Sequence, residues 1–371
     1  MTAPEAHERY LGPNWFASVM GTGIVANAAA TLPIHIPGLR GFAIGVWVLS
    51  AALLAVLGIA VGGHWLRHPH VARDHSAGQQ MVHFYGAAPM ALLTVAAGTL
   101  LVGRDLIGEH LAVDVAWALW TAGTVAGLFT AVSIPFLMFT QYSVEPDAAF
   151  GGWLMPVVPP MVAATTGALL IPHAAAGTAR ATMLYGCYAM FGLSLVAAFL
   201  IIAMIWSRLT HYGTSGTARM ATLWIVLGPV GQSITAAGLL GSVAAQAVDH
   251  EIAGVFNDFA VLYGVPMWGF GVLWITLAAS LTVHGLRRGM PFALTWWSLT
   301  FPVGTFVTGT TQLALHTGLP AFRIAAAIAY AGLLCTWLLV AVRTARGAAR
   351  GSLLAPPPQT GPVKARKERV R

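Results

Sequence analysis

The sequence consists of a succession of long apolar runs, separated by short segments that hold nearly all of its charge. Only 8% of the 371 residues are charged, whereas a soluble domain carries about 25%. A run of about 20 apolar residues crosses the hydrocarbon core of a bilayer as a helix, and a helix satisfies its own backbone hydrogen bonds there. A transmembrane β-barrel is disfavoured because apolar and polar residues do not alternate. We therefore expect an all-α integral membrane protein.

Ten runs are long enough to cross a bilayer. The predicted spans are roughly 13–32, 40–65, 82–103, 113–138, 150–172, 181–207, 218–247, 254–283, 291–316 and 321–343. The first run ends in small residues that resemble a signal-peptide cleavage site, but its acidic flank and its glycine content favour a retained helix. We expect a cytoplasmic N-terminus at 1–12, a ten-helix membrane transport domain at 13–343, and a basic, disordered tail at 344–371.

The distribution of Lys and Arg sets the expected orientation, because short cytoplasmic segments carry an excess of positive charge. With the N-terminus inside, fifteen of the 19 Lys and Arg residues fall in cytoplasmic segments. The other four are Arg40, Arg104, Arg180 and Arg323. We expect a protein of the cell membrane with both termini in the cytoplasm. The net charge of +7 follows from this topology and from the tail, so membrane lipid rather than nucleic acid is the expected partner.

Prolines interrupt the odd-numbered spans at a regular interval. They are Pro89, Pro159, Pro160, Pro229 and Pro302, of which four are spaced 70, 70 and 73 residues apart. A further step of 70 back from the first of them reaches position 19, beside Gly21, Thr22 and Gly23. Hydroxyl side chains follow the later breaks, namely Thr94, Thr165, Ser233, Thr235, Thr305 and Thr308. An internal repeat of this length predicts five units, each of them a helical hairpin.

Each proline removes a backbone N–H and clashes with a carbonyl of the preceding turn. In a membrane the freed carbonyl must face protein or water, so five helices broken at a similar depth are expected to surround a pore. The alternative is that proline and glycine are simply common in membrane helices and that small residues serve helix packing. The even-numbered spans are more uniformly aliphatic, which is typical of an outer ring facing lipid.

Four stretches of the chain resemble the tellurite-resistance/dicarboxylate transporter family. They are WFASVMGTG at 15–23, Phe84-Tyr85-Gly86 through Pro89-Met90, WLMPVV at 153–158, and WWSLTFP at 296–302. The resemblance covers about residues 13–343. The family includes the bacterial tellurite-resistance membrane protein, fungal malate permeases and sulfite pumps, and plant guard-cell slow anion channels.

The resemblance implies a fold of ten helices, arranged as five hairpins around a quasi-fivefold central pore and assembled as a homo-trimer. In family members a phenylalanine on the ninth helix plugs the pore, and the matching residue is Phe301, directly before Pro302. An apolar ring in a narrow pore blocks ions by steric contact and by dewetting. We therefore expect Phe301 to be a pore gate, although an ordinary packing aromatic is the alternative.

The expected function is transport or channelling of small anions such as sulfite, nitrate, chloride or a C4-dicarboxylate such as malate. No Asp, Glu, Lys or Arg lies deep within any span. Coupled carriers usually need such buried groups, so a passive or uniport-like path is favoured, with the anion held by helix dipoles, hydroxyls and backbone N–H groups. The alternative is a proton-coupled C4-dicarboxylate carrier with His83 as its titratable group.

A second alternative, of another class, is a membrane haem or metal-binding enzyme. Its candidate ligands are His64, His68, His70, His75 and His83, which cluster around one cytoplasmic loop. No group of catalytic carboxylates accompanies them. No pair of histidines faces the core between two helices, as a buried haem would need. We therefore expect solvated loop histidines, no metal, no cofactor and no enzymatic activity. Cys187 and Cys335 each lie in an apolar run, where a packing role is expected rather than a disulfide.

Overall fold

A computed structural model of the chain describes residues 11–67, 81–214 and 216–354. In these residues the secondary structure is helical, without a strand. Within these ranges, seven helical stretches are long and apolar enough to cross a membrane. The chain is therefore a polytopic integral membrane protein, as its apolar runs predict.

The helices fall into a long set and a short set. The long helices are α2 (Leu39–Arg67), α6 (Glu109–Thr140), α8 (Thr178–Tyr212), α10 (His250–Arg287) and α12 (Pro320–Ala349). The short helices are α1 (Phe16–Thr31), α4 (Ala87–Gly98), α7 (Pro159–Leu170), α9 (Leu227–Val243) and α11 (Phe301–Thr317). A 3-10 turn precedes each short helix, at Pro13–Trp15, Met81–Gly86, Gly151–Leu154, Thr217–Val226 and Leu294–Leu299. A small helix, α5 (Arg104–Ile107), precedes α6. Three short helices, α1, α7 and α11, are not among the seven candidate spans.

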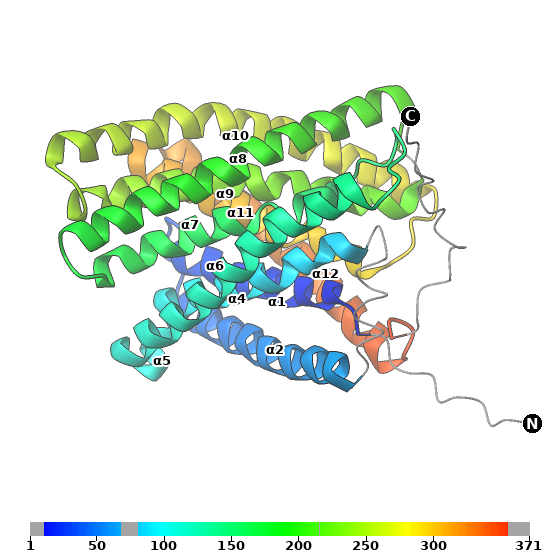
Figure 1. Cartoon of the computed structure of the whole chain (residues 1–371), viewed down its shortest axis with the longest axis horizontal. Coiled ribbons are helices and arrows are strands. Elements are labelled where there is room, and N and C mark those ends of the chain that lie inside the picture. Colours follow the sequence, from blue (N-terminus) through cyan, green and yellow to red (C-terminus); the bar gives the residue numbers. More distant parts are fainter. Residues whose placement is uncertain (1–10, 68–80, 215, 355–371) are drawn as a thin grey trace, which may run out of the picture.

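The short helices lie inside and the long helices outside. The stretches that contain α4 and α9 are 83% and 89% buried, whereas the long helices are 22–28% buried. Each short helix packs on the long helix that follows it, and the short helices also contact one another in the cyclic order α1, α4, α7, α9, α11 and back to α1. Figure 1 shows this arrangement, with α8 and α10 along one edge, α2 along the opposite edge, and α1, α9 and α11 between them.

The prolines occupy a different place in their helices from the one that the sequence predicts. Each of Pro89, Pro159, Pro229 and Pro302 stands among the first three residues of a short helix, after a turn or 3-10 segment. A proline in the first turn of a helix lacks an N–H that would have no partner inside the helix anyway. The predicted mid-helix kink is thus a helix start. The long helices do contain internal prolines, at Pro135 in α6 and Pro266 in α10.

The ends of the membrane domain differ slightly from the predicted boundaries. Helix α12 continues to Ala349, beyond the expected end at 343. The greater part of the predicted cytoplasmic N-terminus and the basic tail from 355 onward lie outside the described residues. Cys187 is buried, Cys335 is exposed, and both are free.

Candidate functional site

Two cavities lie within the ring of short helices, and Phe301 lines both of them. The first, which we call the methionine cavity, is apolar and is lined by residues that include Met20, Phe84, Met90, Met155, Ile225 and Leu294. The second, which we call the threonine cavity, is lined by side chains that include Asn27, Thr94, Thr165, Gln232, Thr235, Thr308 and Gln312. Every one of the five short helices contributes to the threonine cavity. The two cavities therefore meet at a single aromatic ring.

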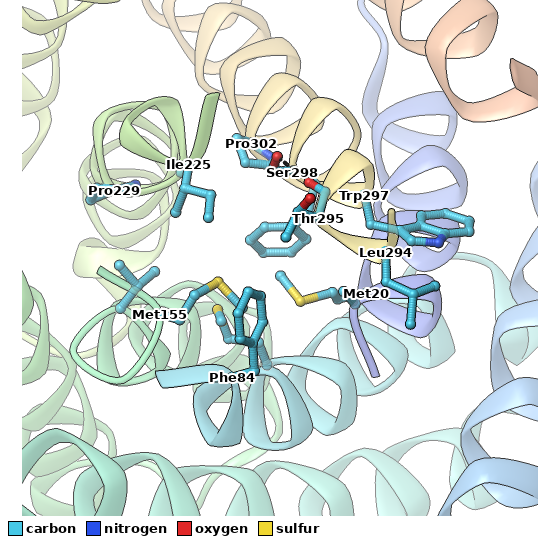
Figure 2. A pocket seen from close by; sticks show the side chains of 15 residues that line it. Met20, Phe84, Met155, Ile225, Pro229, Leu294, Thr295, Trp297, Ser298 and Pro302 are labelled. Carbon is cyan, nitrogen blue, oxygen red and sulfur yellow. Dashed lines mark hydrogen bonds between the residues drawn. The ribbon is translucent and has the colours of Figure 1, made fainter. Parts of the chain in front are cut away.

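The methionine cavity is enclosed by flexible apolar side chains from separate elements. Figure 2 shows Met20, Phe84, Met155 and Ile225 converging on the same space, with Trp297 and Leu294 beside them. Methionine has an unbranched, polarizable side chain that adapts to irregular space. Such a wall offers almost no hydrogen bonds to a solute, but it can change shape.

The backbone around Phe301 is held from two sides. Phe301 begins α11 and is 3% exposed. In the turn before it, Trp297 donates a hydrogen bond to Oγ1 of Thr344 in α12 at 3.1 Å. On the other side Ser298 donates to the carbonyl of Ala221, in the turn before α9. Pro302 follows and restricts the backbone further. The backbone on which Phe301 stands is thus tied to its own long partner, α12, and to the turn before the neighbouring short helix α9.

The hydroxyls of the threonines that line the threonine cavity donate hydrogen bonds mainly to backbone carbonyls. Thr94 donates to the carbonyl of Met90 at 2.7 Å, and Thr165 donates to that of Met161 at 3.1 Å. Thr235 and Thr308 share a hydrogen bond of 2.8 Å and also contact carbonyls of their own helices, at 2.9 and 3.0 Å. A hydroxyl has one proton and two acceptor lone pairs. These oxygens consequently present mainly acceptors to the cavity.

Three carboxamides in the same cavity are functional candidates that the sequence analysis missed. Asn27 donates from Nδ2 to the carbonyl of Thr94 at 3.1 Å. Gln232 and Gln312 are 4% and 5% exposed, and within the described part of the chain neither side chain forms a hydrogen bond. Helical spacing was the signal available for them, since Gln232 stands three residues before Thr235 and Gln312 four after Thr308.

The predicted pore residues divide into two groups. The structure brings Phe301, Pro229 and Pro302 to the methionine cavity, and Thr94, Thr165, Thr235 and Thr308 to the threonine cavity. The remaining predicted residues line neither cavity; they are Gly21, Thr22, Gly23, Pro89, Pro159, Pro160, Ser233 and Thr305.

Several of the residues that line neither cavity form contacts between helices. Thr22 accepts a hydrogen bond from Trp337 of α12 at 3.2 Å, and Ser233 accepts one from Tyr263 of α10 at 2.7 Å. Thr305 donates to the carbonyl of Leu227 in α9 at 3.2 Å. Some of the polar residues near the helix breaks therefore line a cavity, and others form packing contacts between helices.

Charged groups do not line either cavity among the residues that the structure describes. His83 is buried, packs edge-on against Phe150 with ring centroids 5.6 Å apart, and lines neither cavity. In the described ranges, no group of three or more His, Cys, Asp or Glu side chains is placed to hold a metal. His68, His70 and His75 lie outside those ranges.

Known proteins resemble the chain along almost its whole length. The sulfite efflux pump of Trichophyton rubrum is 29% identical over 338 residues, which cover 88% of each chain. An uncharacterized transporter of Methanocaldococcus jannaschii is 27% identical over 330 residues, also 88% of each chain. The malic acid transport protein of Schizosaccharomyces pombe is 21% identical over 343 residues, 88% of this chain and 76% of the relative.

These relatives confirm the resemblance that the sequence motifs carry, since fungal sulfite pumps and malate permeases are among the family's members. A family model for voltage-dependent anion channels matches residues 10–345, which include all ten short and long helices apart from the last residues of α12. The chain therefore belongs to the voltage-dependent anion channel family.

Proposed function

We propose that this protein carries small anions across the cell membrane through the ring of short helices, along a path that is closed at Phe301. The observation that carries the proposal is that one aromatic side chain lines two cavities within the ring. An anion moving from one cavity to the other has to pass that ring. The similarity to sulfite efflux pumps and to malic acid transport proteins supports an anion as the cargo.

The architecture that goes with this proposal is ten transmembrane helices, arranged as five hairpins around a quasi-fivefold pore. The cyclic contacts of α1, α4, α7, α9 and α11, and the packing of each on a long partner, support it. The excess of Lys and Arg on one side supports cytoplasmic termini. In that proposed orientation the methionine cavity faces the cytoplasm and the threonine cavity faces the outside. Assembly as a homo-trimer is proposed from the family resemblance alone.

Transport is proposed to be passive or uniport-like, without a catalytic step or a cofactor. In the described walls of both cavities there is no group that changes charge, and coupled carriers usually use one. The malic acid transport relatives favour a second candidate, a proton-coupled C4-dicarboxylate carrier that uses His83. The burial of His83 away from both cavities makes this candidate the weaker one.

Anion flux into liposomes that contain the purified protein tests the proposal, with chloride, nitrate, sulfite and malate compared. Phe301→Ala is expected to raise the flux severalfold, because it removes the ring between the cavities. Phe129→Ala is the matched control, since Phe129 is exposed on the outer face of α6. Unchanged flux in a well-folded Phe301→Ala protein would refute the gate. Absence of flux for all four anions, with and without the substitution, would refute anion transport.

A further inference from the structure

We propose that the carboxamides of Gln232 and Gln312 are the groups that bind the anion in the threonine cavity, and that they make it a site for monovalent anions. The inference deepens the proposed function and rests on it.

A desolvated anion requires donors, and the threonine wall has few to offer. The protons of Thr94 and Thr165 go to carbonyls of their own helices. Thr235 and Thr308 bond each other and their helix backbones. Because a hydroxyl carries only one proton, these side chains turn lone pairs toward the cavity, where they repel an anion.

Carboxamides differ because each carries two N–H donors. Gln232 and Gln312 are almost fully buried, line the cavity, and form no hydrogen bond with the described residues. Buried polar groups are nearly always paired with protein or water, so amides that face a cavity without a protein partner are available to pair with whatever occupies it. The carboxamide of Asn27 is less available, since it already donates to the carbonyl of Thr94.

The two glutamines stand at different depths of the cavity. Gln232 comes three residues after Pro229, which lines the methionine cavity, so it lies about 4.5 Å further along the helix axis. Gln312 comes eleven residues after Phe301 and therefore lies about 16 Å along α11. An anion that approaches the ring through the threonine cavity consequently meets Gln312 first and then Gln232, next to the ring.

Space for Gln312 is built into the neighbouring helix. A Cβ atom on Gly238 of α9 would stand 2.6 Å from Cβ, 2.8 Å from Cγ and 2.9 Å from Oε1 of Gln312. Only a residue without a side chain permits this arrangement. The glutamine therefore occupies a position prepared for it between α9 and α11.

The same wall explains the preference for a single charge. The cost of removing an ion from water rises with the square of its charge, and burying it is expensive unless the charge is compensated. The described lining contains no Lys or Arg to compensate a second charge. Neutral amide donors suffice for nitrate, chloride or hydrogen sulfite, whereas the sulfite and malate dianions lack a counter-charge.

The test uses Phe301→Ala liposomes, in which the gate is open and the cavity limits the flux. Gln232→Met and Gln312→Met keep the length of the side chain and remove its donors. Each is expected to raise the half-saturating nitrate concentration about tenfold, because this change corresponds to the loss of one hydrogen bond to a charged group. Gln232→Arg supplies the missing counter-charge and is expected to raise malate flux relative to nitrate flux. Gln246→Met, on the exposed surface after α9, is the control and should leave nitrate flux unchanged.

Calorimetric titration of nitrate into the detergent-solubilised protein provides a measurement that does not depend on flux. Weaker nitrate binding in Gln232→Met than in the unchanged protein supports the inference. Flux through Phe301→Ala with the same half-saturation in both Met variants would refute the glutamine site and leave anion transport standing. Absence of flux through Phe301→Ala would refute transport. In that case nitrate binding that does not change in Gln232→Met would refute the glutamine site as well.

Discussion

Gly238 and Gln312 contact each other across α9 and α11 so closely that the glycine position has no room for a side chain. The contact places Cβ, Cγ and Oε1 of Gln312, a residue that lines the threonine cavity, against the backbone of α9. It also joins α9 and α11 beside the proposed path, so a shift of α9 changes the position of the Gln312 side chain on α11.

Gly238→Ala is expected to weaken anion binding without unfolding the protein. The added methyl group would stand 2.6 Å from Cβ of Gln312, an atom attached directly to the backbone, so α11 has to shift locally and the amide is displaced from its place in the cavity. The half-saturating nitrate concentration should rise severalfold in Phe301→Ala liposomes. Gly254→Ala is the control, because a Cβ at this exposed position of α10 meets no atom within 4 Å. Identical nitrate dependence in the two variants would contradict the prediction.

Gly231→Ala is expected to destabilise the protein itself. A Cβ at Gly231 would meet backbone atoms of α11, among them the carbonyl carbon of Thr305 at 2.5 Å and Cα of Phe306 at 2.7 Å. Backbone cannot move aside as a side chain does, so α9 and α11 have to separate. Overpacking of this kind costs about 1–3 kcal/mol.

Thermal unfolding in detergent measures the effect of Gly231→Ala. Gly192→Ala in α8 is the comparison, since its Cβ meets no atom within 4 Å and alanine favours helix. The prediction requires a lower midpoint for Gly231→Ala than for Gly192→Ala. Equal midpoints would show that the two helices are less tightly packed than in the structure.

The hydropathy of the sequence was sufficient to locate the five long helices, which are long and apolar enough to be recognised as candidate spans, whereas α1, α7 and α11 are not among the seven candidate spans. The 70-residue proline spacing indicated the inner helices, but it predicted breaks in mid-helix where the structure has helix starts. The faces of these helices were not predictable. All but the last two residues of α1 are buried, so polarity does not distinguish the side toward the cavity from the side toward a neighbour. Thr22, for example, is a threonine like those that line the cavity, but its hydroxyl faces α12 instead.

Ser194→Ala is expected to lower stability through the start of α7. Ser194 of α8 accepts a hydrogen bond from the N–H of Met161 at 3.0 Å and donates one to the carbonyl of Val157 at 2.7 Å. These backbone groups flank the two prolines that open α7. Leaving a buried group without its partner costs about 1–3 kcal/mol.

The midpoint of thermal unfolding is again the measurement for Ser194→Ala. Ser207→Ala, on the exposed face of α8, is the matched control and should change it little. A loss of stability that is equal in both variants would be a general effect of the substitution in α8 and would contradict the specific role of Ser194.

Arg208→Met is expected to leave stability unchanged or to raise it. Arg208 is 2% exposed, and among the described residues its Nε and Nη1 atoms have no hydrogen-bond partner. Of the charged groups that act on it most, Arg219 repels it and Asp147 attracts it. Replacing a buried charge that the described residues leave without an ion pair by an apolar side chain of similar length removes a desolvation cost.

Arg287→Met at the exposed end of α10 is the control for Arg208→Met, and surface changes of this kind usually stay within about 0.5 kcal/mol. Unfolding midpoints of the two variants are compared with that of the unchanged protein. A clear decrease for Arg208→Met alone would contradict the prediction and would mean that the guanidinium has a partner in the folded protein.

The position of Phe301 at the junction of two cavities has an electrical consequence for the proposed path. A membrane voltage does work on an ion in proportion to the charge moved through the field, and the field is strongest where conducting space is interrupted. On this path the interruption is a single aromatic ring. The voltage is therefore concentrated at the beginning of α11, and an anion experiences most of it while it passes one side chain.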